Sequence, residues 1–374
     1  MVHSFWENKQ RSKKTLAKYF LSLQYKTIFC IFHIWIIAFL EVYGGFLSTL
    51  EHFGGCLCGS VRYRVQGDPL VTNVCHCRQC QLRTGSAFGI GIYHYTDKVG
   101  LLSGKLALYE YESERGNSWL FKRCKHCGTC IFIYQKKNND RVGITGGTFD
   151  PPTFWYNLTA QTYTRSKAQF CSIESKYSFE TQPNYVRTKL VDSRLNGAEL
   201  VISSSNHYGG CLCGSVRFDM EGDPKLLGVC HCRYCQLRTG SGFGVSAISS
   251  KDRFHIKSGK FDKYEYKSDK DVQVTINRCN ICGSSIFWTL ADKNLENLIV
   301  ISGGTFDPPT FWTEVDYEYF TRSRAHFCNI DCGNAWETSR SYKKPDALEA
   351  RLVGIKSTWK SFYFYFFYLA WKIY

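Results

Sequence analysis

The sequence predicts an all-β protein built from two consecutive copies of one domain. The stretch Gly-Gly-Cys-Leu-Cys-Gly-Ser-Val-Arg begins at Gly54 and again at Gly209. A repeat 155 residues long indicates a duplicated domain rather than a solenoid. Within each copy, short stretches alternate between apolar and polar residues with a period of two, as β-strands do. Regular helical periodicity is weak throughout both copies.

The spacing between the two copies changes once along the chain. Cysteines up to Cys127 recur 155 residues later, whereas Gly-Thr-Phe-Asp-Pro-Pro at Gly147 recurs at Gly304, 157 residues later. The second copy therefore has a two-residue insertion in the part that corresponds to Phe132 through Gly147. We expect five regions: an N-terminal extension over 1–50, a first domain over 51–175, a linker over 176–206, a second domain over 207–332 and a C-terminal extension over 333–374.

Predicted strands occupy matching places in the two copies. Residues 61–65 and 216–220 alternate in polarity, as do residues 106–111 and 261–266, and Gly, Asp or Ser bounds each stretch. Residues 142–145 and 298–301 run into Gly-Gly and then Asp-Pro-Pro, which is typical of a strand followed by a turn. We expect one short helix over 345–356, because Pro345 is suited to a first helical turn.

The net charge of +15 lies mostly outside the two copies. Residues 1–50 hold 6 basic and 2 acidic side chains, and residues 341–374 hold the same numbers. Residues 51–180 have 16 basic against 10 acidic side chains, and residues 181–340 have 19 against 18. The domains themselves are therefore close to balanced. This distribution disfavours nucleic acid as the partner of the folded part, although the basic tails could contact an acidic surface.

The first 50 residues differ in composition from the rest. Basic residues precede an apolar run from Thr27 to Leu40, which Glu41 follows. Fourteen residues are fewer than the about 20 that a transmembrane helix needs. The basic flank would also send the domains across the membrane, away from the cytosol. We therefore expect a poorly ordered extension in preference to a signal peptide or an anchor over residues 27–50, and we expect the same of the aromatic run over 361–374.

Fourteen of the 19 cysteines fall into three clusters per copy, spaced C-x-C, C-x-C-x-x-C and C-x-x-C. Neighbouring thiols at these spacings suit metal chelation and are poorly placed for disulfides. Thiolate sites of this kind imply a reducing compartment, so we expect the cytoplasm, with the nucleus as an alternative. The clusters are Cys56 and Cys58, Cys75, Cys77 and Cys80, and Cys124 and Cys127 in the first copy, and Cys211 and Cys213, Cys230, Cys232 and Cys235, and Cys279 and Cys282 in the second.

Seven cysteines per copy divide naturally into four and three. Four thiolates make a closed tetrahedral zinc site, and three leave one coordination position for water or substrate. In one arrangement the outer C-x-C and C-x-x-C pairs form the closed site and the central triad forms the open one. In a second arrangement the triad recruits one outer cysteine. In a third, His76 or His231 completes a closed Cys3His site without chemistry.

Five motifs, each present twice, carry a resemblance to a known family. In order they are Gly-Gly-Cys-x-Cys-Gly-x-Val-Arg-Tyr/Phe, Cys-His-Cys-x-x-Cys, Arg-Thr-Gly-Ser, Cys-x-x-Cys-Gly and Gly-Thr-Phe-Asp-Pro. They resemble the family of the glutathione-dependent formaldehyde-activating enzyme and centromere protein V, over residues 52 to about 171 and 207 to about 328. Family members often have a second Asp where Pro151 and Pro308 stand.

The resemblance implies a fold and a set of ligands. The fold would be all-β and Mss4-like, also called a β-tent, with two zinc ions per domain and four per chain. The structural zinc ions would be held by Cys56, Cys58, Cys124 and Cys127 and by Cys211, Cys213, Cys279 and Cys282. The catalytic zinc ions would be held by Cys75, Cys77 and Cys80 and by Cys230, Cys232 and Cys235.

The resemblance also implies a reaction, the addition of the glutathione thiol to formaldehyde, which in reverse is a carbon-sulfur lyase reaction. An open zinc site can bind a thiolate or polarise an aldehyde oxygen. Arg78, Arg83, Arg233 and Arg238 would offset the thiolate charge, pair with substrate carboxylates, or simply lie in solvent. The alternative is a zinc-stabilised binding module without catalysis, of the centromere protein V type. Retention of all seven cysteines in both copies favours the enzyme.

The other five cysteines lie outside this scheme. Cys171 and Cys328 occupy equivalent places and are expected to be buried structural thiols. Cys130 is three residues beyond Cys127 and could compete for metal, but Ser285 stands at its counterpart. Cys30 and Cys332 have no counterpart. The sequon at Asn157 would stay unused in a reducing compartment.

Overall fold

The computed structural model describes residues 50–113, 116–183, 206–268, 271–308 and 314–339. The chain divides into two compact units, residues 1–51 and 52–374, and both copies lie in the second unit. We call residues 52–183 the first half and residues 206–339 the second half. The predicted helix over 345–356 and the apolar run over 27–40 lie outside the described residues.

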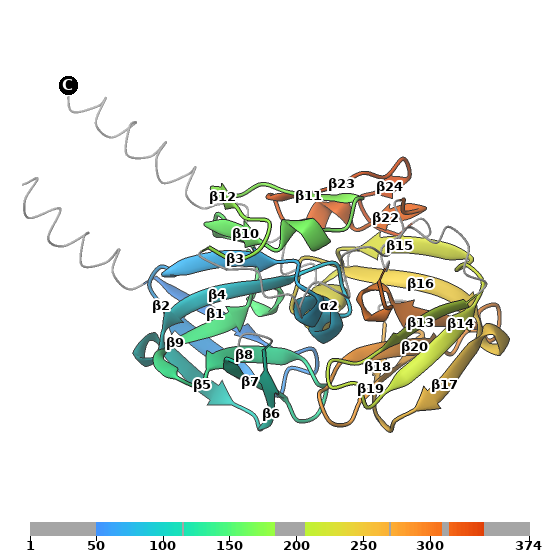
Figure 1. The fold of residues 1–374 in the computed structure, drawn as a ribbon, viewed down its shortest axis with the longest axis horizontal. Coiled ribbons are helices and arrows are strands. Elements are labelled where there is room, and N and C mark those ends of the chain that lie inside the picture. Colours follow the sequence, from blue (N-terminus) through green and yellow to red (C-terminus); the bar gives the residue numbers. More distant parts are fainter. Residues whose placement is uncertain (1–49, 114–115, 184–205, 269–270, 309–313, 340–374) are drawn as a thin grey trace, which may run out of the picture. The chain divides into compact units, whose positions relative to one another are not determined.

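Both halves consist mainly of β-strands, as predicted (Figure 1). The strands of the first half are β1 (Glu51–Gly55), β2 (Arg62–Gln66), β3 (Val71–Cys75), β4 (Gly89–Tyr95), β5 (Val99–Ser103), β6 (Leu106–Glu112), β7 (Ser118–Cys124), β8 (Cys130–Gln135), β9 (Asn138–Thr145), β10 (Ala160–Thr162), β11 (Cys171–Ile173) and β12 (Tyr177–Ser178). Those of the second half are β13 (Asn206–Gly210), β14 (Arg217–Glu221), β15 (Leu226–Cys230), β16 (Gly244–Ser250), β17 (Phe254–Ser258), β18 (Phe261–Lys267), β19 (Gln273–Cys279), β20 (Ser285–Leu290), β21 (Leu298–Ser302), β22 (Tyr317–Tyr319), β23 (Cys328–Ile330) and β24 (Ala335–Trp336).

The two halves repeat one sheet arrangement. A three-stranded sheet has the order β1-β2-β5 in the first half and β13-β14-β17 in the second. An eight-stranded sheet has the order β12-β10-β3-β4-β9-β8-β7-β6 in the first half, and β24-β22-β15-β16-β21-β20-β19-β18 in the second. Because equivalent strands take equivalent places, the duplication read from the sequence is a duplication of the fold.

The predicted strands are present because alternate residues can be buried on one face. In β2, Tyr63 and Val65 are fully buried, while Arg64 and Gln66 between and after them are exposed. In β18, Tyr264 is buried between the exposed Lys263 and Glu265. The pattern of period two therefore predicted real core positions in both sheets.

Two short helices were not predicted. Helix α2 (Arg78–Thr84) and helix α3 (Arg233–Thr239) each cover seven residues. Each ends at a glycine in the left-handed conformation, Gly85 with φ 67° and Gly240 with φ 66°, which is a common way for a helix to end. A helix of two turns is too short to show a periodic apolar stripe. Shorter 3-10 turns are η1 (Thr96–Lys98), η2 (Gly146–Thr148), η3 (Thr164–Ser166), η4 (Lys251–Arg253), η5 (Gly303–Thr305) and η6 (Thr321–Ser323).

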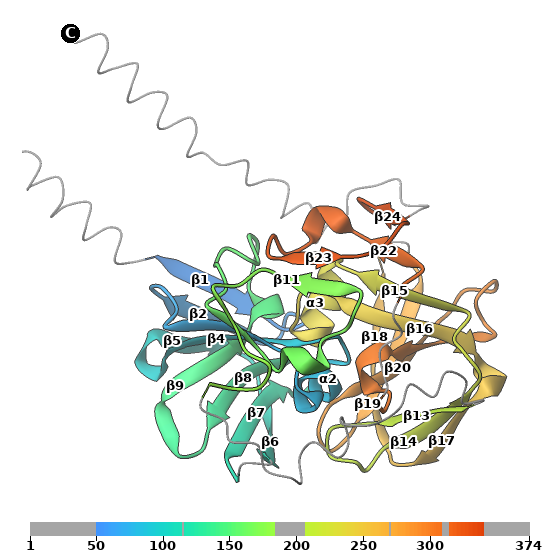
Figure 2. The same cartoon turned by 45° about the horizontal axis from the view of Figure 1, so that its top comes forward.

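The two halves share a core and exchange hydrogen bonds. Strand β11 of the first half pairs with β23 of the second in antiparallel fashion, and Figure 2 shows these strands side by side. The hydroxyl of Ser86 donates to the carbonyl of Phe243, and the hydroxyl of Ser241 donates to that of Phe88, each at 2.8 Å. The rings of Phe88 and Phe243 meet edge to face, 5.1 Å apart. Each contact occurs with its counterpart, so the halves are related as two subunits of a dimer would be.

The Gly-Thr-Phe-Asp-Pro motif has two structural roles. Its glycine lies against the opposite half, where the amide of Gly147 donates to the carbonyl of Gly240 at 3.1 Å. A Cβ atom at Gly147 would come 2.2 Å from the carbonyl oxygen of Ser241, so only glycine fits there. The aspartate of the motif pairs within its own half, since Arg62 donates from Nη1 to Asp150 at 3.0 Å. Arg217 and Asp307 form the equivalent pair.

Candidate metal centres

The four cysteines of the predicted closed site come together in the first half. The sulfurs of Cys56, Cys58, Cys124 and Cys127 all lie within 4.8 Å of one another. The Sγ of Cys58 is 3.3 Å from that of Cys56 and 3.7 Å from that of Cys124. Cys58 lies just after β1 and Cys124 ends β7, so the fold brings together two cysteines that lie 66 positions apart.

The second half repeats this cluster. The sulfurs of Cys211, Cys213, Cys279 and Cys282 also lie within 4.8 Å of one another. The Sγ of Cys213 is 3.4 Å from that of Cys211 and 3.6 Å from that of Cys279. In both halves three of the four cysteines are buried and one is half-buried.

The donors fit a zinc ion. Zinc-sulfur bonds of about 2.3 Å in a tetrahedron place the sulfurs about 3.8 Å apart, close to the distances between Cys58 and Cys124 and between Cys213 and Cys279. The amide of Val61 donates to the Sγ of Cys56 at 3.2 Å. The hydrogen bond with Cys127, aided by Ser60, lowers the pKa of Cys58 to about 5 against the opposing effect of burial. These donors stabilise thiolate, the form that binds metal.

The triad cysteines also come together in each half. The sulfurs of Cys75, Cys77 and Cys80 lie within 4.8 Å of one another, as do the equivalent sulfurs of the second half. Cys75 ends β3, Cys77 is the residue before α2, and Cys80 lies in the first turn of that helix. The second triad has the same placement, with Cys230 ending β15, Cys232 preceding α3 and Cys235 in its first turn. The helices that sequence analysis missed therefore position both triads.

An arginine lies beside one sulfur of each triad. Hydrogen bonds with Cys75 and Cys77 are the first causes that lower the pKa of Cys80, and Arg83 lowers it further. Burial is the largest single effect on the pKa of Arg83 and lowers it. The negative charges of Cys130 and Cys80 and their hydrogen bonds together raise this pKa by more, so the pKa of Arg83 is raised overall. Among the described residues, no fourth metal-binding side chain groups with either triad. A zinc ion at either triad would therefore keep one coordination position for another ligand.

Arg238 takes the place of Arg83 in the second half. Its Nη2 lies 4.0 Å from the Sγ of Cys235, and its guanidinium lies over the ring of Trp288, 4.2 Å from the centroid. In the first half the guanidinium of Arg83 lies over Phe121 instead, 5.7 Å from the centroid. The sequence allowed Arg83 and Arg238 to offset thiolate charge, to pair with substrate carboxylates or to lie in solvent. Their positions beside Cys80 and Cys235 agree with the first of these roles.

Two half-buried tyrosines beside the triads were missed. Burial first, and then the negative charges of Cys80 and Cys75, raise the pKa of Tyr93 in β4. The pKa of Tyr266 in β18 is also raised, first by burial and then by the negative charges of Cys235 and Cys232. The ring of Tyr93 fills the space above Gly91, where a Cβ atom would come within 2.8 Å of it. A glycine inside a strand is a sequence signal for such a close neighbour, and Gly143 of β9 meets the same ring.

The two histidines of the central motif do not join the metal clusters, because every group of metal-binding side chains among the described residues consists of cysteines alone. His76 is fully buried and meets Phe88 edge to face, with centroids 5.6 Å apart. The Nε2 of His231 lies 2.9 Å from the Oε1 of Glu318. These contacts make both histidines part of the core, and the geometry does not support the Cys3His alternative.

Arg78 and Arg233 reach across to the opposite half. Arg78 donates from Nη1 to the carbonyl of Gly304 at 2.8 Å. Arg233 donates to the carbonyl of Gly147 at 2.7 Å and is only 3% exposed. The interpretation that these arginines merely lie in solvent is therefore wrong for Arg233.

The remaining cysteines behave as follows. Cys171 and Cys328 are buried, as expected, but their sulfurs lie 3.8 Å apart across the β11–β23 pair. Cys130 is outside the metal clusters and lies near Arg83. Cys332 is half-buried, and Cys30 lies outside the described residues.

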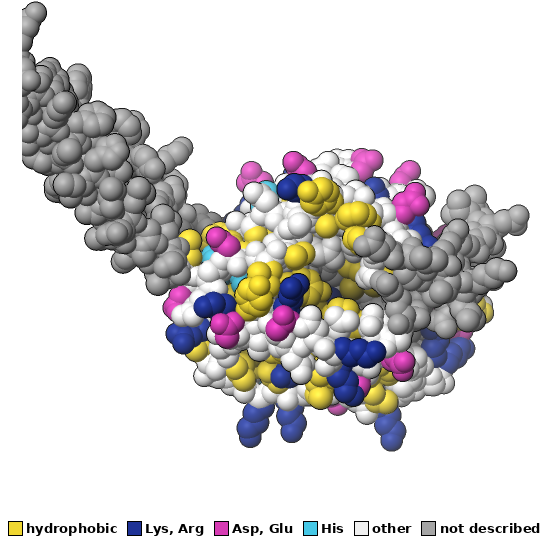
Figure 3. Space-filling view, turned by 60° about the vertical axis from the view of Figure 1, so that its left-hand side comes forward, with side chains coloured by type: hydrophobic (Ala, Val, Ile, Leu, Met, Phe, Trp, Pro, Cys, Tyr) yellow, Lys and Arg dark blue, Asp and Glu magenta, His cyan; other side chains and the backbone are white. Residues whose placement is uncertain are grey.

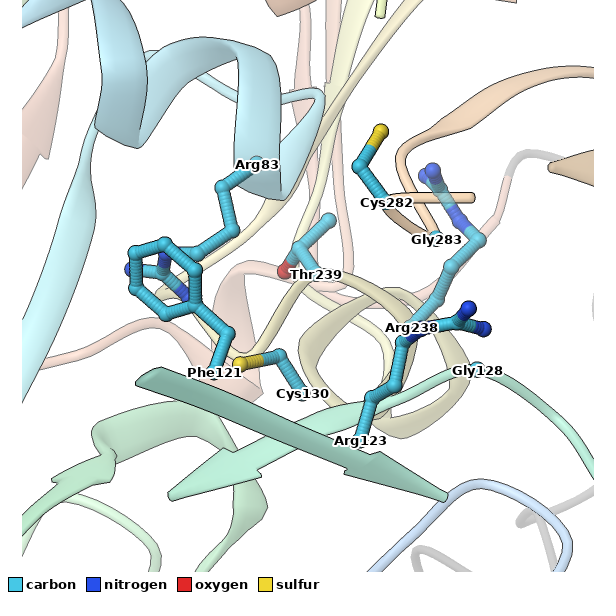
Figure 4. A pocket seen from close by; sticks show the side chains of 9 residues that line it. All are labelled: Arg83, Phe121, Arg123, Gly128, Cys130, Arg238, Thr239, Cys282 and Gly283. Carbon is cyan, nitrogen blue, oxygen red and sulfur yellow. The ribbon is translucent and has the colours of Figure 1, made fainter. Parts of the chain in front are cut away.

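A pocket lies where the two halves meet (Figure 4). Arg83, Cys130 and Arg123 of the first half contribute to its wall, and Arg238 and Cys282 of the second half face them. The pocket therefore lies between the arginines that stand beside the two triads and one cysteine of a four-cysteine cluster. No helix in the described part of the chain is long and apolar enough to cross a membrane.

Comparison with known proteins gives a clear family match. The family model described as glutathione-dependent formaldehyde-activating enzyme matches residues 51–166 and again residues 206–323, together more than half of the chain. No curated protein matches. The crystal structure of a Rhodobacter sphaeroides protein is 21% identical to this chain, over 28% of this chain and 95% of that one, with a TM-score of 0.22.

Proposed function

We infer the function of this chain from its family: it belongs to the glutathione-dependent formaldehyde-activating enzyme family, and we propose that it is a zinc-dependent enzyme of the carbon-sulfur lyase type. Its substrate would be the adduct of a small thiol, such as glutathione, with an aldehyde. The observation that carries the proposal is the pair of three-cysteine clusters, each of which offers a zinc ion three ligands and leaves one position open.

We assign the cysteines as the family resemblance implies. Cys75, Cys77 and Cys80 would hold one catalytic zinc ion, and Cys230, Cys232 and Cys235 the other. The two four-cysteine clusters would hold structural zinc ions. When bound at a triad, zinc would supply a Lewis acid for an aldehyde oxygen and a binding position for a thiolate.

The protein would contribute charge balance at the triads. Three thiolates around Zn²⁺ carry a net charge of −1, and a substrate thiolate would bring it to −2. Arg83 beside Cys80 and Arg238 beside Cys235 each place one positive charge where this negative charge gathers. Thiol binding as thiolate is therefore less costly at these positions than it would be without the arginines.

A serine at the central cysteine of each triad tests this proposal. We expect Cys77→Ser and Cys232→Ser each to remove the activity of its own half, and the double variant to reduce the rate of glutathione-formaldehyde adduct formation to that of buffer. A lost ligand should weaken metal binding by more than the about 10–100-fold that outer-shell changes cost. The rate of adduct exchange, followed by NMR, measures the effect.

The control is Cys332→Ser, which alters a half-buried thiol outside every cluster. It should keep the rate of the unaltered protein. If the double variant stays folded and retains full activity, the triads are not the site of the reaction. If the unaltered protein with zinc bound is no faster than buffer, the binding-module alternative takes its place. In that case the balanced charge of the folded part argues against a nucleic-acid partner, since basic and acidic side chains are interspersed on the face in Figure 3.

A further inference from the structure

Each four-cysteine cluster is in contact with an arginine from the opposite half. Arg123, in β7 of the first half, donates from Nη2 to the carbonyl oxygens of Asn280 at 3.1 Å and Ile281 at 3.0 Å. These are the two residues between Cys279 and Cys282, so the arginine holds the turn that presents both sulfurs. Arg123 is 7% exposed and directly precedes Cys124 of its own cluster.

The second half returns the same contact. Arg278 is the equivalent of Arg123, directly precedes Cys279 and is 3% exposed. It donates from Nη2 to the carbonyl of Lys125 at 3.3 Å, in the turn between Cys124 and Cys127. A contact that appears twice, at equivalent positions and in opposite directions, is a property of the fold and not an accident of one side chain.

A glycine after each cysteine turn makes room for the arginine of the other half. A Cβ atom at Gly283 would lie 2.5 Å from the Cδ of Arg123, and one at Gly128 would lie 2.2 Å from the Nη1 of Arg278. Figure 4 shows Arg123 in the same pocket as Cys282 and Gly283. The glycine of Cys-x-x-Cys-Gly is thus needed for space as well as for its positive φ.

A tyrosine of the opposite half also lies near each cluster. Burial is the first cause that raises the pKa of Tyr264, and the negative charges of Cys127 and Cys58 add to it. The ring of Tyr264 meets His126 edge to face with centroids 5.3 Å apart. Tyr109 is the equivalent of Tyr264, and its charged neighbours are Cys282 and Cys213 of the second half.

Negative groups lie close to Arg278. Its Nη2 lies 3.6 Å from the Oδ2 of Asp262, and the same nitrogen donates to the turn between Cys124 and Cys127. Zn²⁺ with four thiolates carries a net charge of −2. A buried site of this charge is stabilised by a nearby cation. Groups that hold the ligands of a metal in place also have a strong effect on its affinity.

We propose that each four-cysteine zinc site is completed by the arginine of the opposite half, so that Arg123 secures zinc in the second half and Arg278 secures zinc in the first. The proposal rests on the assignment of zinc to the four-cysteine clusters, and it does not depend on turnover. It makes the two halves one metal-binding unit in which neither closed site has its full surroundings alone.

The test compares zinc protection of individual cysteines in the full chain. The zinc-loaded protein is challenged with EDTA and iodoacetamide, and alkylation of each cysteine peptide is followed by mass spectrometry. We expect Arg123→Gln to speed alkylation of Cys279 and Cys282 by about 10–100-fold, as for other outer-shell changes, and to leave the first-half cluster near its normal rate. Arg278→Gln should show the reverse pattern.

Two further sets of variants keep the result interpretable. Arg123→Lys and Arg278→Lys retain the charge but not the planar guanidinium that donates to the opposite turn, so they should give the same crossed pattern with smaller rate increases. Lys251→Gln removes one exposed positive charge that belongs to no cluster, and it should change neither rate.

The crossed pattern decides the proposal. Faster alkylation in the half that carries the variant would show that Arg123 and Arg278 act only on the cysteines next to them in sequence, and would overturn it. If the glutamine and lysine variants speed alkylation equally in both halves, the variants cause general unfolding, and this result would also overturn the proposal. If zinc does not protect the four-cysteine clusters of the unaltered chain, the metal assignment itself fails, whatever the activity.

Discussion

Replacing Cys124 with serine is expected to unfold the first half, and Cys279→Ser is expected to unfold the second. Structural zinc sites contribute about 10–16 kcal/mol of binding free energy, which counts as folding free energy when the site is absent from the unfolded chain. A domain is typically stable by only about 5–15 kcal/mol. In each half the cluster joins the segment after the first strand to a cysteine 66 positions later, so one lost ligand frees the start of the domain from its middle.

Thermal unfolding and zinc content measure this effect together. We expect each variant to lose its structural zinc ion and to show a transition of reduced amplitude, because one half no longer unfolds cooperatively. Cys130→Ser is the matched control, since Cys130 lies three residues beyond Cys127, is outside the cluster and has serine at its counterpart. A Cys124→Ser chain that keeps its zinc content and its full transition would show that the cluster does not stabilise the fold.

Removal of Arg233 should give the largest loss of stability among changes outside the cysteines. This side chain is buried between the halves and donates to the carbonyl oxygens of Gly147 at 2.7 Å and Thr148 at 3.4 Å. Burial lowers its pKa to about 10, so it remains charged at neutral pH. Arg233→Ala leaves both acceptors without their donor and opens a cavity, and we expect a loss of about 3–5 kcal/mol in urea unfolding.

The equivalent Arg78→Ala is the comparison. The side chain of Arg78 is 12% exposed and also lies 3.6 Å from Asp307, at the edge of the same interface. Water can reach the acceptors that this variant frees, so its loss of stability should be the smaller of the two. Equal losses, or an Arg233→Ala chain within about 1 kcal/mol of the unaltered protein, would mean that the buried contact contributes little.

Sequence reasoning was most successful where the physical requirement is local or repeated. Metal ligands must have particular spacings, so C-x-C, C-x-C-x-x-C and C-x-x-C identified all fourteen sulfurs that the structure gathers into four clusters. The strands β2, β14, β6 and β18 were predicted from alternation, because burial on one face has a period of two. The roles of the cysteines and the exact domain boundaries stay predictions.

Contacts between the halves could not be read from the sequence. Nothing in the pattern of either copy indicates that Arg123 reaches Asn280, or that Cys171 lies beside Cys328. Such contacts depend on how two folded domains pack, and a single sequence carries no signal for pairs separated by about 157 positions. The helices α2 and α3 were missed for a different reason, since a helix of seven residues shows no periodicity.

Zinc content per chain tests the central claim most directly. Four separate clusters of cysteine sulfurs lie close enough to bind metal. Elemental analysis of the purified full-length protein should therefore find about four zinc ions per chain, falling to about two in the Cys77→Ser, Cys232→Ser double variant. Two zinc ions in the unaltered protein would leave the triads empty and would contradict the account.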